Sequence, residues 1–122
     1  MNPRNLTVSE AELLRFLLPE GAFPDVGIYR DQVAHARVIG GCGCGCPSIA
    51  LSVDPRARRA RFHGDPLLPV EAEGAGADFV QVLVFARAGW LEYLELVCFD
   101  GPALRAFPPA SGLRRVDRRT QR

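Results

Sequence analysis

The stretch FVQVLVFARAGWLEYLELVCF, residues 79–99, decides the fold of this chain. Nine of its 21 residues are valine or aromatic, and one glycine, Gly89, interrupts it near the middle. Such residues favour the pleated, half-buried surface of a sheet, and glycine favours tight turns. The stretch therefore predicts an antiparallel hairpin of two strands, residues 79–87 and 90–99.

The connection between these strands determines which residues pair. A two-residue turn would place Ala88 at a positive φ, which is unfavourable for any residue that has a Cβ. We therefore predict a three-residue loop over 87–89 with Gly89 in the left-handed region. This register pairs Gln81 with Glu95 and so matches polar positions with each other.

Both faces of this hairpin are rich in apolar side chains. One face carries Val80, Val82, Val84, Leu94, Leu96 and Cys98. The other face carries Gln81 and Glu95 together with Phe79, Leu83, Phe85, Leu91, Tyr93 and Val97. Faces this apolar are not stable in water, so we expect helices on one face and a further layer, or another chain, on the other.

The helical signals lie in the N-terminal third of the chain. Two overlapping capping boxes start at Thr7 and Ser9, and apolar residues follow at helical spacing over residues 11–18. Pro19 and the glycine two residues later end this helix. A second, shorter helix is expected to begin at Asp25, with an apolar stripe along one side.

Shorter segments between these regions predict the remaining strands. Residues 36–40 and 49–53 favour a second hairpin, because apolar and small polar residues alternate in the latter. Residues 61–63 and 70–72 are expected to add short edge strands, and 74–76 a turn.

Together these segments predict an α+β fold in a single domain spanning residues 1–111. An N-terminal helix, with the second helix beside it, packs on an antiparallel sheet of four to six strands. Residues 112–122 are basic and lack apolar periodicity, so we expect a disordered tail there.

Composition narrows the class of protein. The chain has 122 residues and a formal net charge of +1, which gives no global field for nucleic acid or membrane. The arginine clusters lack the interleaved aromatic residues that stack on bases, so nucleic-acid binding is not expected. No secretory signal and no apolar run of membrane-spanning length is visible, so we expect a cytoplasmic protein with reduced thiols.

The chemically distinctive segment is the loop GGCGCGCP, residues 40–47, at the tip of the second hairpin. Three thiols in five residues, at Cys42, Cys44 and Cys46, are typical of a soft-metal site or of thiol chemistry. An extended backbone would hold neighbouring thiols about 7 Å apart, so the chain has to curl before they can converge. Glycines that alternate between the thiols in the left-handed conformation would allow this and form a nest of N–H groups.

Three sulfurs suit trigonal Cu⁺ or three of the four ligands of Zn²⁺. The fourth ligand is open: His35 is the first candidate, Cys98 the second and His63 the third. A lone histidine is more often a surface residue, and Cys98 also fits a core thiol. The loop equally fits a tight glycine turn with inert cysteines.

Other catalytic patterns are absent: the sequence has no P-loop, no G-x-S-x-G, no G-x-G-x-x-G and no H-E-x-x-H. Enzymatic activity is therefore left open and is not favoured. The string from Gly41 to Ser48, with residues 94–101, resembles short uncharacterised proteins of GC-rich bacteria that carry a G-C-G-C-G-C-P loop. No activity is established for them, so the resemblance implies no site residue.

Two functions follow from the sequence. The first is binding of Zn²⁺ or Cu⁺, or thiol chemistry, by the cysteine loop. The alternative is a non-enzymatic protein-binding module in which the loop is structural. In that case the partner, a second copy of the chain or an immunity-like target, would bind the exposed face of the 79–99 hairpin.

Overall fold

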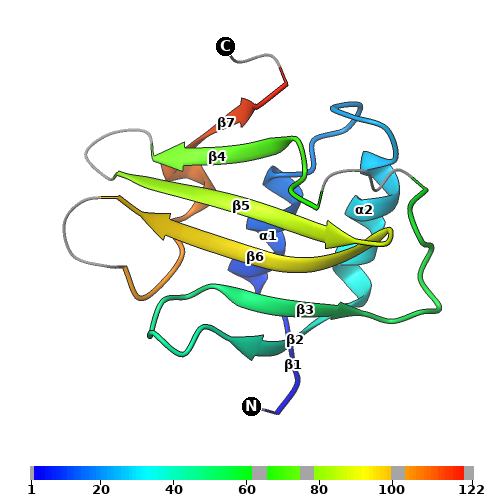
Figure 1. The fold of residues 1–122 in the computed structure, drawn as a ribbon, viewed down its shortest axis with the longest axis horizontal. Helices are drawn as coiled ribbons and strands as arrows, with labels where there is room; N and C mark the ends of the chain where they lie inside the picture. The colour runs from blue at the N-terminus through cyan, green and yellow to red at the C-terminus, as the bar shows by residue number, and fades with distance from the viewer. Residues whose placement is uncertain (1, 62–65, 75–78, 100–103, 120–122) are drawn as a thin grey trace.

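The computed structural model describes residues 2–61, 66–74, 79–99 and 104–119 and shows two helices behind one antiparallel sheet (Figure 1). The strand order is β1-β2-β3-β6-β5-β4-β7. The elements are β1 Arg4–Asn5, α1 Val8–Phe16, α2 Val26–Gln32, β2 Ala36–Gly41, β3 Ile49–Val53, β4 Val70–Gly74, β5 Val80–Arg87, β6 Trp90–Cys98 and β7 Leu113–Asp117, with 3₁₀ turns at Val33–His35 and Ala110–Gly112. The α+β class is confirmed, but the sheet has seven strands where four to six were expected.

The first of the two capping boxes starts α1. The Thr7 hydroxyl accepts a hydrogen bond from the Glu10 N–H, and the Glu10 carboxylate accepts one from the Thr7 N–H. The same carboxylate is held by both terminal nitrogens of Arg4, each at 2.9 Å. This ion pair lowers the pKa of Glu10 and ties the short strand β1 to the helix.

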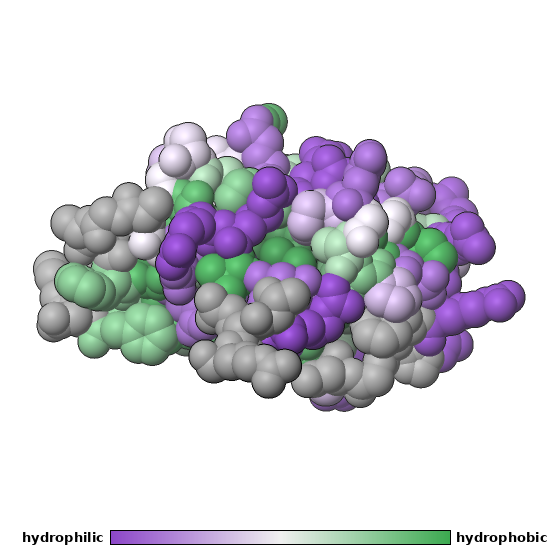
Figure 2. Space-filling model, turned by 90° about the horizontal axis from the view of Figure 1, so that it is seen from above, coloured by the Kyte–Doolittle hydropathy of each residue, from purple (hydrophilic) through white to green (hydrophobic). Residues whose placement is uncertain are grey.

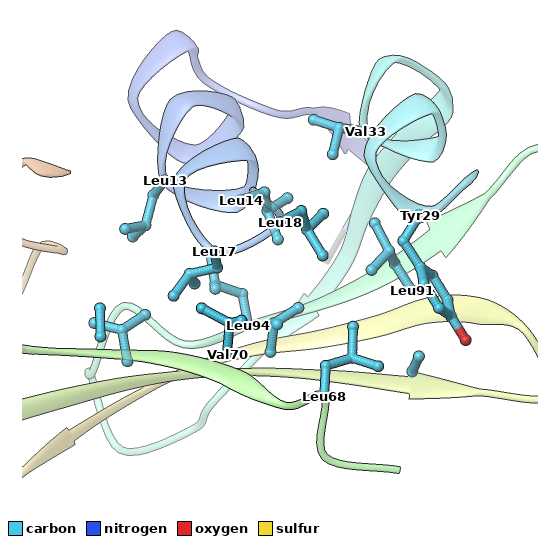
Figure 3. Packing of buried hydrophobic residues seen from close by; sticks show 14 of the residues in the cluster. Leu13, Leu14, Leu17, Leu18, Tyr29, Val33, Leu68, Val70, Leu91 and Leu94 are labelled. Atoms are coloured by element: carbon cyan, nitrogen blue, oxygen red, sulfur yellow. The ribbon is translucent and has the colours of Figure 1, made fainter. Parts of the chain in front are cut away.

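The core lies between the helices and the sheet (Figure 3). Leucines at the end of α1 and just beyond it point toward the sheet, and Tyr29 and Val33 approach from α2 and the turn after it. Residues of β4, β5 and β6 complete the cluster, with Leu94 and Val84 fully buried. The face of the 79–99 hairpin that carries Val80, Val82 and Val84 is therefore the one that the helices cover.

The turn of this hairpin differs from the expectation. Arg87 pairs with Trp90, and the turn has two residues, Ala88 at φ 52° and Gly89 at φ 87°. Gln81 accordingly lies opposite Val97, and Glu95 lies opposite Leu83. The predicted three-residue loop and the pairing of Gln81 with Glu95 are wrong.

Tertiary contacts explain why Ala88 accepts the unfavourable φ. Its carbonyl accepts a hydrogen bond from Arg59 Nε at 2.7 Å, and the Gly89 carbonyl accepts two more, from the Ala60 N–H at 3.0 Å and from Gln32 Nε2 at 2.8 Å. Gly89 also lies so close to Ala60 that a Cβ would stand 2.2 Å from the Ala60 carbonyl oxygen. The turn is thus fixed by the segment that packs on it.

A β-bulge follows this turn and moves one leucine to the other face. The register shifts between Phe85 and Ala86, so that Ala86 pairs with Leu91 while Phe85 pairs with Tyr93. Leu91 is 1% exposed and belongs to the core, not to the face that it was expected to share with Tyr93. Its N–H donates to Gln32 Oε1 at 2.9 Å, which holds the bulge against α2.

The expected basic tail forms a strand over most of its described length. β7 pairs with β4 along five residues, and Leu113 and Val116 are both buried. These two apolar residues lie on opposite faces of β7, so the segment shows no simple alternation. Its arginines are engaged: Arg115 lies over the Phe16 ring at 4.7 Å, and Arg118 donates to two carbonyls of the 67–68 segment.

The side of the molecule seen in Figure 2 shows hydrophilic side chains interspersed with hydrophobic ones. The edge strand of the sheet at this end is β7. The ion pair between Arg114 and Glu73 spans β7 and β4. Charged residues along an exposed strand disfavour edge-to-edge pairing with another sheet.

The remaining predictions concern two short strands, a turn and membrane-spanning segments. Residues 70–72 are in a strand as predicted, although β4 lies between β5 and β7 and is not an edge. Arg61 is in a bend, and the rest of the 61–63 strand lies outside the described residues, as does most of the 74–76 turn. No helix in the described part of the chain is long and apolar enough to cross a membrane.

The two residues of the turn, Ala88 and Gly89, should differ in how a substitution changes the free energy of unfolding. We expect Gly89→Ala to lower the free energy of unfolding by about 2 kcal/mol or more, because its Cβ meets the Ala60 backbone. Ala88→Gly should change it by less than about 0.5 kcal/mol, because relief of the left-handed alanine offsets the greater entropy of the unfolded chain. Urea unfolding measures both, and equal effects would contradict the close approach at Gly89.

Candidate metal centre

The cysteine loop joins β2 to β3 and projects at the left of Figure 1. The Cys42 N–H donates to the Ser48 carbonyl at 3.3 Å, so the last bond of the hairpin closes the loop. Gly45 has φ 89°, a conformation that allows the chain to reverse, whereas Gly43 does not have a positive φ. One left-handed glycine therefore curls the loop, and the expected alternation of left-handed glycines is not formed.

The curl brings the three thiols together. The sulfur atoms of Cys42, Cys44 and Cys46 all lie within 4.8 Å of one another. Cys44 is exposed, and the other two are half-buried. A metal bonded to three sulfurs at about 2.3 Å in a plane would place them about 4.0 Å apart, so shifts of about 1 Å would suffice for coordination.

Ser48 connects the loop to the centre of the sheet. Its side chain is buried, and its Oγ accepts a hydrogen bond from the Leu96 N–H of β6 at 2.9 Å. Hydrogen bonding lowers the pKa of Cys46 to about 7. The Ser48 hydroxyl contributes most, followed by Cys44 and the Ser48 N–H. The hydrogen bond with Cys44 raises the pKa of Cys42 to about 11. The structure thus favours the thiolate form at Cys46.

Two residues distant in sequence border the loop. The guanidinium of Arg105 stands 3.9 Å from the position that a Cβ on Gly45 would occupy. The segment that carries Arg105, after β6, passes beside the loop in Figure 1. The pKa of Tyr93 on β6 is raised mainly by burial. A negative charge on Cys42 or Cys46, which lie near Tyr93, raises it further.

The other expected ligands do not join the three sulfurs. His35 is exposed at the opposite end of β2, and the six residues of that strand separate it from the loop by about 20 Å. Cys98 is half-buried, lies opposite Val80 and packs against the core. His63 lies outside the described residues. Among the described residues, no further His, Cys, Asp or Glu belongs to the group.

Sequence reasoning found the three cysteines and missed their surroundings. Ser48 gave a weak signal, because it follows the loop directly and opens a strand. Tyr93 was assigned only to an apolar face, and Arg105 gave no signal. The contacts of Tyr93 and Arg105 with the loop depend on strand order and on the path of the 104–112 segment, which local patterns do not contain.

Similarity to known proteins offers no second route to the function. Comparisons of the chain with protein-family models, with curated proteins and with solved structures find no match. The function therefore has to be inferred from the loop and the residues around it.

The thiols should differ in reactivity in the metal-free, reduced protein. Because the thiolate is the nucleophile, Cys46 should be alkylated by iodoacetamide faster than Cys42 at neutral pH. Its rate should rise as the pH passes through about 7, while that of Cys42 should rise near pH 11. Tandem mass spectrometry of the labelled peptide measures the order.

Removal of the Ser48 hydroxyl tests the cause. Ser48→Ala should move the pH profile of Cys46 upward, because the thiolate loses the hydrogen bond that lowers its pKa most. Ser52→Ala is the matched control: Ser52 is exposed on β3, the strand that follows Ser48. Identical profiles for both variants would show that Ser48 does not act on Cys46.

Proposed function

We propose that this protein binds one soft metal ion through Cys42, Cys44 and Cys46. The observation that carries the proposal is the convergence of three sulfur atoms within 4.8 Å in a loop of alternating glycine and cysteine. Thiolate is the preferred ligand of Cu⁺ and a common ligand of Zn²⁺. If the loop holds no metal in the cell, the same three thiols support thiol chemistry, with Cys46 as the nucleophile.

The loop is organised before a metal arrives. The hydrogen bond from Cys42 to Ser48 closes it, and Ser48 is fixed in turn by Leu96. Ordering of a ligand loop opposes binding, so a loop already closed loses less conformational entropy when the metal binds. The small shifts needed at sulfur can then come from side-chain rotation.

Elemental analysis of protein purified without an affinity tag and without oxygen tests the proposal. We expect about one zinc or copper per chain, and none in the variant with Cys42, Cys44 and Cys46 all changed to Ser. Cys98→Ser and His35→Ala should retain the metal, because these residues lie apart from the three sulfurs. Wild-type protein without metal, even after anaerobic loading with Zn²⁺ or Cu⁺, would contradict the proposal.

The two loop glycines supply a control for loop shape. Gly45→Ala should weaken the metal about tenfold, because alanine at φ 89° is strained by about 1–2 kcal/mol and the loop opens to relieve it. Gly43→Ala should leave the affinity within about twofold, because its Cβ would meet no atom within 4 Å. Competition with a chromophoric chelator measures both variants.

A specific observation favours a second candidate function, protein binding through the uncovered face of the sheet. In Figure 1 the helices lie behind the sheet, and no described segment crosses its front. A groove of about 430 Å³ is open on that face, lined by Ile39, Ala50, Leu51, Phe85, Glu92, Tyr93 and Glu95. A homodimer would bury this apolar surface, at about 800 Å² per partner in an interface of standard size.

Light scattering at micromolar concentration tests this candidate. We expect a dimer that Ile39→Arg converts to a monomer, because Ile39 lines the groove and is 47% exposed. Val8→Arg is the control, since Val8 is an exposed apolar residue of α1 at 76% and lies outside the groove. A monomeric wild type would rule out the homodimer.

A further inference from the structure

The three sulfurs are one ligand short of a structural Zn²⁺ site, but they are enough for Cu⁺. Zn²⁺ in structural sites takes four protein ligands, and no fourth His, Cys, Asp or Glu of the described residues joins the group. Cu⁺ is satisfied by three thiolates in a plane. The ligand count therefore favours Cu⁺.

The charge around the loop supports the same choice. Three thiolates and Cu⁺ carry a net charge of −2, compared with −1 for Zn²⁺. The Arg105 guanidinium beside Gly45 offsets part of that negative charge. Glu95 lies near Tyr93 and adds negative charge on that side of the loop, so the positive charge beside Gly45 comes from Arg105.

The three sulfurs are not held equally. Cys46 lies two residues before Ser48, which is buried and whose Oγ accepts a hydrogen bond from the Leu96 N–H. The Cys42 N–H donates to the Ser48 carbonyl just beyond the end of β2, and both Cys42 and Cys46 are half-buried. Cys44 lies at the tip of the loop and is exposed, with an open space beside Gly43. A molecule that approaches the site from solvent therefore meets Cys44 first.

Resting on the proposed function, we propose that this site holds Cu⁺ and exchanges it with the thiolate of a second molecule, and that Cys44 is the ligand that leaves. The incoming thiol releases its proton to solvent, and its sulfur bonds to Cu⁺ as the bond to the Cys44 sulfur breaks. The Cys44 thiolate then takes up a proton. Copper stays monovalent throughout, so the step needs no oxidant or reductant.

Transfer kinetics test the exchange. Protein loaded anaerobically with Cu⁺ is mixed with a fixed excess of a chromophoric Cu⁺ chelator and increasing glutathione as the probe thiol. The transfer rate should rise in proportion to glutathione over at least a tenfold range. S-Methylglutathione, which has no thiol, should give no acceleration. A rate independent of glutathione, or equal acceleration by both compounds, would overturn the proposal.

Alkylation identifies the leaving ligand. In the Cu⁺-loaded protein all three loop thiols should resist iodoacetamide, and glutathione should expose Cys44 while Cys42 and Cys46 remain protected. Exposure of Cys46 first would overturn the assignment. Arg105→Glu should weaken Cu⁺ about five- to tenfold, whereas Arg105→Lys and the distant Arg58→Glu should change it less than twofold. Equal effects of the two glutamate variants would remove Arg105 from the site.

The outcomes separate this proposal from the proposed function. One copper per chain with a rate insensitive to glutathione refutes the exchange and leaves metal binding intact. Stoichiometric zinc with no retained Cu⁺ refutes both the choice of metal and the exchange, and leaves metal binding intact. Absence of both metals refutes the proposed function, and the exchange with it.

Discussion

The pairing of β5 with β6 is the constraint on which the other elements depend. It buries Val84 and Leu94 under the helices and, through the bulge, adds Leu91 to the same core. β6 also pairs with β3 on its other side. The Leu96 N–H of β6 donates to the Ser48 Oγ, and the Ser48 carbonyl accepts from the Cys42 N–H. The position of the thiols is therefore set from the centre of the sheet and not by the loop alone.

The sequence predicted those helices and strands whose stabilising interactions are between residues close together in the chain. The capping box at Thr7 depends on residues three apart, and the alternation of strand residues depends on neighbours, so α1 and the central strands could be predicted. The turn at Ala88 could not, because the hydrogen bonds that stabilise it come from Arg59 and Ala60. Tertiary contacts there outweigh a local preference of about 1–2 kcal/mol.

The same distinction explains the two edge strands. β1 has only two residues and is held by the ion pair of Arg4 with Glu10. The 112–122 segment reads as a solvated run because its five arginines outnumber its two large apolar residues, Leu113 and Val116. The guanidinium groups of Arg115 and Arg118 nevertheless contact the Phe16 ring of α1 and the Leu67 carbonyl. A run of charged residues in this position can therefore be a disordered tail or an edge strand. Which of the two forms depends on the path of the chain and not on the local sequence.

At the candidate site, the sequence identified the three cysteines but not the residues that surround them. His35 is near the cysteines in sequence, but the extended strand β2 lies between them and places His35 at the opposite end of the strand from the loop. Arg105 is about sixty residues away from the loop, yet its guanidinium borders it. The consequence is an asymmetric group of thiols: Cys42 and Cys46 are half-buried on either side of the loop, and Cys44 is exposed at its tip. The proposed exchange of the metal depends on that asymmetry, because in a closed structural site protein ligands fill every coordination position.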